Sequence, residues 1–266
     1  MMGTYGDPTY MPVNAPLVVS MPGATLADVT RWQPLYLDAM VSQNGIPVPE
    51  QTQGFVGARW GGVRPFALER EDPLLPYHDP GAPPRLGGVG DARMRAEVTE
   101  VLRLQSVLDP TSPETINLSP NSLGNNALGR NDGSGYGINP ITGMPYADRV
   151  VPLADFGRVL AEYWADGPES ETPPGHWNVI ANEVADHPRF ERRFFGTGDL
   201  VAPLEWDVVV YFMLNGALHD AAICAWGIKR HYDSIRPISL IRYMASQGQA
   251  SDPMLPSYDV DGDRKS

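Results

Sequence analysis

The stretch Glu205–Arg242, EWDVVVYFMLNGALHDAAICAWGIKRHYDSIRPISLIR, decides the fold. It is an apolar, small-residue run without proline until Pro237, which predicts one long helix. Lys229 and Arg236 stand seven residues apart in it, a spacing of about two helical turns. The spacing predicts that the two cations leave one helix from nearly the same face and converge on an anion.

A stripe of polar residues follows the same predicted face, at steps of three, four or seven residues: Asn215, His219, Trp226, Lys229, Asp233 and Arg236. A polar stripe that faces a core must bind something, because the rest of the helix is apolar. Lys229 is one of only two lysines, the other being Lys265, whereas arginine is the usual cation of this chain. A lysine here indicates a point charge placed for a ligand.

The pattern of Lys229, six intervening residues, Arg236 and Pro237 resembles the first of three signature motifs of a superfamily. That superfamily comprises the vanadium-dependent haloperoxidases and the type 2 phosphatidic acid phosphatases. Further stretches resemble its bacterial haloperoxidase-like branch: Trp226, HDAA at 219–222, ETPPGHWN at 171–178, RWQPL at 31–35 and WGGVRPFAL at 60–68. The resemblance implies a mainly α fold, the helical core of a haloperoxidase or acid phosphatase.

The resemblance also implies a role for each matching residue. In the superfamily, the lysine and arginine of this motif bind the non-bridging oxygens of vanadate or phosphate, so Lys229 and Arg236 are expected to bind the anion and to be catalytic. Trp226, one turn before Lys229, is expected to line the pocket. A Ser-Gly-His motif and a later arginine and histidine complete the family's site, and this chain contains neither. We therefore expect the N-terminal portion of such a protein, inactive by itself.

Several alternatives stay open. Vanadate as cofactor implies halide and peroxide as small-molecule substrates, whereas phosphate implies hydrolysis of a phosphate ester. A non-catalytic helical module that binds an oxyanion is a third possibility. At the level of single residues, Lys229 could form an ordinary surface ion pair with Asp233, and Trp226 could be an ordinary core side chain.

The remaining candidates for chemistry favour structural roles. None of the five histidines matches the acid/base or vanadium-binding histidine of the superfamily. His219 stands roughly 15 Å along the helix from Lys229 at about 1.5 Å per residue, and His176 is expected to order a turn. The acidic run DVDGD at 259–263 resembles the start of a calcium loop, but Arg264 stands where such a loop has glycine. An acidic tail is the better interpretation, and no metal site is predicted.

Charge and hydropathy exclude some partners. The formal net charge is −12, which repels nucleic acid and anionic membranes. The apolar run 208–226 carries Asp220, and an aspartate at the centre of a membrane span costs about 2.5 to 3.5 kcal/mol, so a core helix is predicted instead. The single cysteine, Cys224, gives no information on redox compartment. The first basic residue is Arg31 and no signal peptide is recognised, so the compartment stays open.

The chain contains 27 glycines and 27 prolines, which predicts long irregular connections. We expect a loop-rich region over 1–150, with one helix near 91–108, and a helical region over 151–266 that carries the first anion-binding motif. No strands are predicted. Pro237 should end or bend the long helix. An incomplete helical core leaves apolar surface exposed, so poor solubility or self-association is expected.

Overall fold

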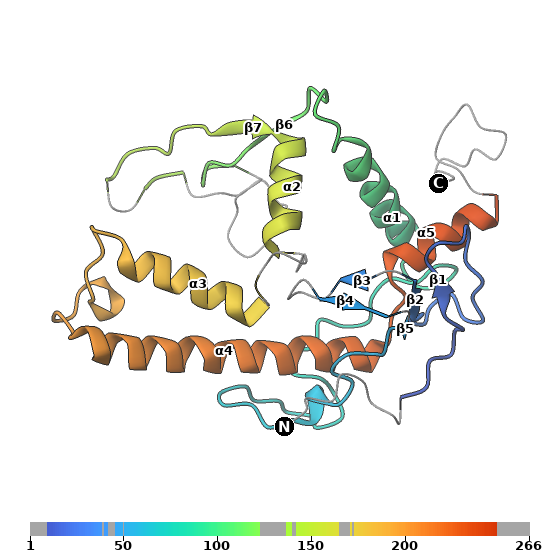
Figure 1. Cartoon of the computed structure of the whole chain (residues 1–266), viewed down its shortest axis with the longest axis horizontal. Coiled ribbons are helices and arrows are strands. Elements are labelled where there is room, and N and C mark those ends of the chain that lie inside the picture. The colour runs from blue at the N-terminus through green and yellow to red at the C-terminus, as the bar shows by residue number, and fades with distance from the viewer. Residues whose placement is uncertain are drawn as a thin grey trace. The chain divides into compact units, whose positions relative to one another are not determined.

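A computed structural model describes most of the chain, and its helices dominate (Figure 1). The described residues are 10–38, 40–41, 46–49, 51–122, 137–139, 142–164, 171 and 173–248. The helices are α1 (Asp91–Ser106), α2 (Leu153–Trp164), α3 (Pro173–Asp186), α4 (Pro203–Tyr232) and α5 (Pro237–Ser246), with 3₁₀ turns η1 (Trp60–Gly62) and η4 (Phe194–Gly196). The prediction of a mainly helical fold is confirmed. The acidic run 259–263 and Lys265 lie outside the described residues.

The chain divides into two compact units. The first contains residues 1–99 and 168–266, and the second contains residues 100–167. Every candidate site residue belongs to the first unit. The division at residue 150 that composition suggests stays a prediction.

Short strands accompany the helices. In the first unit, β2 (Leu35–Leu37) pairs in parallel with β1 (Leu17–Val18) and antiparallel with β5 (Gln51–Thr52). Antiparallel pairs also join β3 and β4, and β6 and β7 in the second unit; their bounds are Met40–Val41, Pro47–Val48, Thr115–Asn117 and Val150–Pro152. The prediction of no strands is wrong, because strands of two or three residues are too short to show alternation in the sequence.

The long helix breaks between the two cations. α4 ends at Tyr232 and α5 begins at Pro237, with Arg236 at the N-cap of α5. Between the helices Asp233 adopts the left-handed conformation, with φ 45° and ψ 46°, which few non-glycine residues take. The prediction that one helix displays both cations is therefore wrong. The long helix ends before Pro237, in keeping with the predicted break. Pro237 itself opens α5, and it fits the first turn because it has no N–H to donate.

A buried network holds this break in place. The Asp233 side chain accepts a hydrogen bond of 2.7 Å from the Tyr10 hydroxyl and lies 2.8 Å from an Arg31 nitrogen. The N–H of Trp32 donates to the backbone oxygen of Asp233, also at 2.8 Å. Burial and the bond to Asp233 raise the pKa of Tyr10, which keeps its hydroxyl a donor. The N-terminal arm, residues 10–34, is therefore part of the structure around the α4–α5 turn.

Apolar clusters lie before and after the turn. The first consists of Tyr10, Trp32 and Phe55, with Ala58 and Trp226 packed against it. The second consists of Val98 from α1 and Leu240 and Met244 from α5. The end of α4 packs on the first cluster and α5 belongs to the second. Burial of apolar surface therefore stabilises the helix before the turn and the helix after it.

The 3₁₀ turn η1 packs directly on α4. A Cβ atom on Gly61 would lie 2.7 Å from the Cα atom of Gly227, so only glycine fits there. The loop after η1 is held by Asp220, whose carboxylate accepts the backbone N–H groups of Phe66 at 2.8 Å and Ala67 at 2.7 Å. These contacts fix the C-terminal half of α4 against the N-terminal part of the chain.

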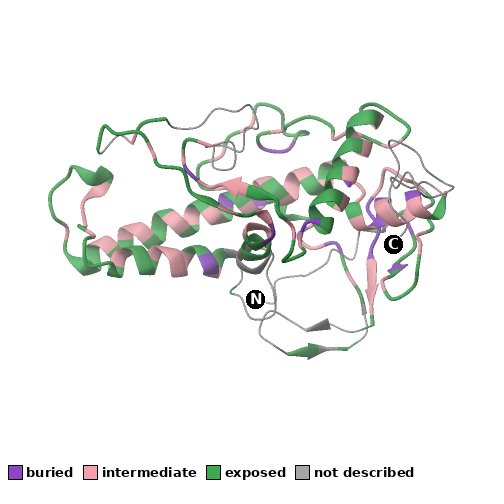
Figure 2. Ribbon diagram, turned by 90° about the horizontal axis from the view of Figure 1, so that it is seen from above, coloured by how far each residue is buried: buried purple, intermediate pink, exposed green. Residues whose placement is uncertain are grey.

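The N-terminal half of α4 is exposed, as its green and pink colours in Figure 2 show. Asp220 and Ile223 are the buried residues of this helix. The prediction of a buried core helix is therefore wrong, because few elements of the described chain cover it. Among the described helices, α4 is the one whose length and apolar composition would allow it to cross a membrane.

α3 lies alongside α4 (Figure 1). Asn178 of α3 and Asn215 of α4 exchange two amide hydrogen bonds of 3.1 Å. In the first turn of α3, His176 Nδ1 lies 3.2 Å from a carboxylate oxygen of Glu171, which precedes the helix. Asn215 therefore joins two helices, although the sequence placed it in a ligand-binding stripe.

Candidate functional site

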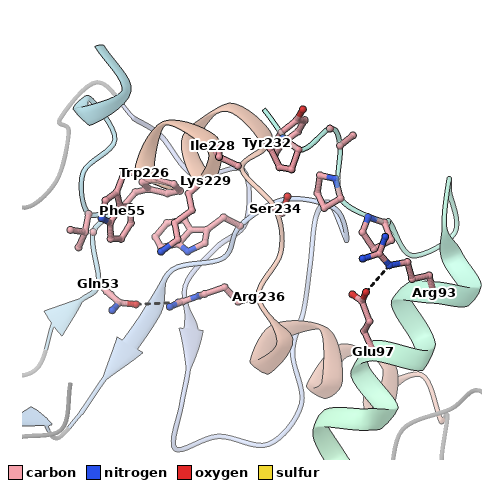
Figure 3. Close-up of a pocket in the computed structure, with 18 residues that line it drawn as sticks. Gln53, Phe55, Arg93, Glu97, Trp226, Ile228, Lys229, Tyr232, Ser234 and Arg236 are labelled. Carbon is pink, nitrogen blue, oxygen red and sulfur yellow. Dashed lines mark hydrogen bonds and ion pairs between the residues drawn. The ribbon is translucent and has the colours of Figure 1, made fainter. Parts of the chain in front are cut away.

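A pocket of about 600 Å³ lies beside the α4–α5 turn (Figure 3). Its walls come from the N-terminal arm, the loop 53–56, the proline-rich stretch 80–84, α1 and the end of α4. The three residues that the sequence singled out, Trp226, Lys229 and Arg236, all line it. The structure thus brings Lys229 and Arg236 to one cavity even though they belong to different elements.

Lys229 lies in the last turn of α4 with its side chain exposed. Its Nζ atom is 4.1 Å from the centre of the Trp226 ring, a cation–π contact. The alternative partner, Asp233, is bound to Arg31 and Tyr10 instead. No carboxylate among the described residues forms an ion pair with Lys229, so its charge is available to a ligand.

Arg236 is half-buried at the start of α5. One of its terminal nitrogens donates to the backbone oxygen of Gln33 at 3.3 Å and to Oε1 of Gln53 at 3.1 Å. Its Nε is buried and has no hydrogen-bond partner among the described residues. Burial lowers the pKa of Arg236, because it removes water from the charged guanidinium. A bound anion would compensate for that loss.

The two cations share one aromatic wall. The guanidinium carbon of Arg236 lies 5.5 Å from the ring centre of Trp32, as Lys229 lies over Trp226. Phe55 stands between the tryptophans, with ring centres 5.1 Å from Trp32 and 6.3 Å from Trp226. Aromatic rings attract cations, so this wall helps to hold both charges at the pocket.

This arrangement suits a small anion with several oxygen atoms. The ammonium of Lys229 offers a point charge and the guanidinium of Arg236 offers directional N–H donors. No histidine lines the described pocket. The described residues also contain no group of three histidine, cysteine, aspartate or glutamate residues that could hold a metal ion. The described lining therefore offers two cations suited to an anion, and no histidine for proton transfer.

His219 supports the neighbouring loop instead of the pocket. Its ring centre lies 5.0 Å from that of Phe66, and its Nδ1 is 3.1 Å from Asp220. Burial by itself raises the pKa of Asp220, but the N–H donors of Ala67 and Phe66 outweigh it and lower the pKa to about 2. This carboxylate is thus a charged anchor for the loop.

Sequence reasoning missed the N-terminal half of the site. Trp32, Gln53 and Phe55 line the pocket, and Gln33 supplies a backbone acceptor to Arg236. The stretch RWQPL at 31–35 was a signal for two of them, since it carries part of the family resemblance. Nothing local marks Gln53, which lies 183 positions before its partner.

Residues 209–252 match a family model described as the VCPO second helical-bundle domain. The match covers most of α4 and all of α5, and it includes Trp226, Lys229 and Arg236. No curated protein and no solved structure matches the chain significantly. The helical segment that carries both cations is therefore similar to vanadium haloperoxidases.

Proposed function

We propose that Lys229 and Arg236 bind a tetrahedral oxyanion in this pocket, and that the oxyanion is vanadate in a haloperoxidase-like reaction. The supporting observation is that both cations line one pocket and neither pairs with a described carboxylate. The buried Nε of Arg236 gains its missing acceptor if an anion oxygen lies there. The similarity of residues 209–252 to a haloperoxidase domain favours vanadate over phosphate.

Each residue has a distinct part in holding the anion. Lys229 supplies a point charge, and Arg236 supplies N–H donors that Gln53 helps to orient. Trp226 and Trp32 pack against the two cations and help to keep them at the pocket. Bound vanadate would supply the electrophilic activation of hydrogen peroxide toward halide.

Turnover needs more than anion binding. General acid–base catalysis requires a side chain within hydrogen-bond reach of the reacting group, and no histidine lines the described pocket. We therefore propose that this chain alone binds vanadate without oxidising halide, until a histidine from elsewhere completes the site. Because no histidine lines the described pocket, the second candidate is a non-catalytic oxyanion-binding module and not a phosphate-ester hydrolase.

Titration of the purified chain with vanadate, followed by calorimetry or vanadium NMR, tests the binding. Lys229→Met combined with Arg236→Met should weaken binding at least about tenfold, because two charge-assisted contacts are lost. Arg64→Met is the matched control, since this exposed arginine lies outside the pocket. Unchanged binding in the double variant would place the site elsewhere.

A bromide oxidation assay with vanadate and peroxide tests the second part. We expect the rate with the purified chain to equal that of vanadate in buffer. Turnover above this background, lost in the double variant, would refute the claim that the pocket needs a histidine from elsewhere.

A further inference from the structure

The pocket is much larger than an oxyanion. A tetrahedral oxyanion has four oxygen atoms and takes roughly the space of four water molecules, about 120 Å³ at ~30 Å³ each. The cavity measures about 600 Å³. Pockets of about 300 to 1,000 Å³ are the ones that take organic molecules. Most of the space therefore stays open when an oxyanion occupies the cationic end.

The wall beside the cations is apolar and partly aromatic. Figure 3 shows Phe55 and Trp226 together on one side, with Ile228 and Tyr232 farther along α4. The Tyr232 hydroxyl donates to Asp79 at 2.6 Å and is thus already used. The stretch 80–84, PGAPP, adds three prolines, which carry no backbone N–H.

Few polar side chains are left to recognise a polar organic group. Arg93 and Glu97 of α1 form an ion pair of 2.7 Å with each other at an exposed position (Figure 3). Gln53 is engaged by Arg236. Of the side chains that line the described pocket, Ser234 is the remaining neutral polar one. A sugar or another polyhydroxylated group would leave its hydroxyls without partners here, which costs affinity.

We propose that the pocket takes a flat apolar organic group beside the oxyanion, so that its organic ligands are aryl-bearing oxyanions of the aryl phosphate type. This inference rests on the proposed function, because Lys229 and Arg236 hold the anionic end. The aromatic group packs on Trp226 and Phe55, whose rings already meet edge to face at 6.3 Å. The size and the aromatic wall of the cavity set this preference.

Calorimetric titration with inorganic phosphate, methyl phosphate and phenyl phosphate tests the inference on the unmodified chain. Phenyl phosphate should bind about tenfold more tightly than methyl phosphate, since one ring is buried against aromatic side chains. Equal affinities, with inorganic phosphate still bound, would overturn the aryl preference and leave the oxyanion site intact. If none of the three ligands binds, the proposed oxyanion site fails as well.

Variants of the wall give a second test. The readout is the ratio of phenyl to methyl phosphate affinity, because a general loss of anion binding cancels in the ratio. Trp226→Leu should bring the ratio close to one, and Trp226→Phe should retain most of it. Ile228→Trp, which fills the pocket from another of its lining positions on α4, should also lower the ratio several-fold. A ratio unaffected by Trp226→Leu and Ile228→Trp would show that the ring binds outside this wall.

Discussion

The side-chain oxygen of Gln53 accepts a hydrogen bond of 3.1 Å from the guanidinium of Arg236, across 183 positions of sequence. A neutral amide at this position orients the arginine without cancelling its charge. A glutamate of nearly the same shape would cancel it. The identity of residue 53 therefore decides whether Arg236 is available to an anion.

Gln53→Glu should weaken vanadate binding about tenfold or more, because the new carboxylate competes with the ligand for Arg236. Gln53→Ala is the control for loss of the hydrogen bond alone and should have the smaller effect. The measurement is a vanadate titration of the three proteins. Equal affinity of Gln53→Glu and the original protein would mean that Arg236 does not hold the anion.

Asp233→Asn should lower the free energy of unfolding by about 2 kcal/mol, because Arg31 loses its charged partner in a buried network. Asparagine tolerates the left-handed backbone of this position, so the effect reports the charge and not backbone strain. Tyr10→Phe removes one hydrogen bond and should cost about 1 kcal/mol. Urea unfolding followed by circular dichroism checks both values. An Asp233→Asn variant as stable as the original protein would contradict the role of this network.

Gly61→Ala should destabilise the protein by about 1 to 3 kcal/mol, because the added carbon meets the backbone of Gly227 at 2.7 Å. Gly62→Ala is the matched control, since a Cβ atom there has nothing within 4 Å. Thermal or urea unfolding compares the two variants. If they are equally stable, η1 and α4 do not pack as closely as the structure shows.

Stability should fall in acid through Asp220. Its folded pKa of about 2 lies below its ordinary value of 3.8, so the folded protein takes up this proton at lower pH than the unfolded chain does. The stabilisation is therefore complete above about pH 4 and is lost as the pH falls toward 2. Asp220→Asn should be less stable at neutral pH and should lose less stability between pH 4 and 2. Asp207→Asn, an exposed carboxylate on α4, is the control, and identical pH profiles of the two variants would contradict the prediction.

Self-association should occur through the exposed face of α4. Leu204, Val208 and Phe212 are spaced by four residues and are 76%, 62% and 71% exposed. Val208→Ser combined with Phe212→Ser should shift the mass measured by light scattering toward the monomer, because contiguous apolar surface drives association. Val89→Ser, on another exposed apolar residue, should not change it. A monodisperse monomer before any substitution would refute this expectation.

The sequence by itself determined the long helix and the motif that carries the family resemblance, because both depend on residues close together in the chain. The apolar run before Pro237 predicts a long helix, and a proline fits the first turn of a following helix. The long helix and a break near Pro237 therefore follow from residues close together. The same stretch carries the family resemblance and the three candidate residues Trp226, Lys229 and Arg236. That these residues bind vanadate stays a prediction.

Tertiary structure decided the rest. The sequence could not show that Asp233 pairs with Arg31 and Tyr10 instead of Lys229. It also could not show that the helix already ends at Tyr232, so that the chain turns between the two cations and not after them. It also gave no sign that Gln53 meets Arg236. Helix propensity depends on neighbours within a turn or two, whereas the partner of a buried polar group depends on which distant segments pack around it. For this reason the helices of this protein were readable from its sequence, and the partners of its charges were not.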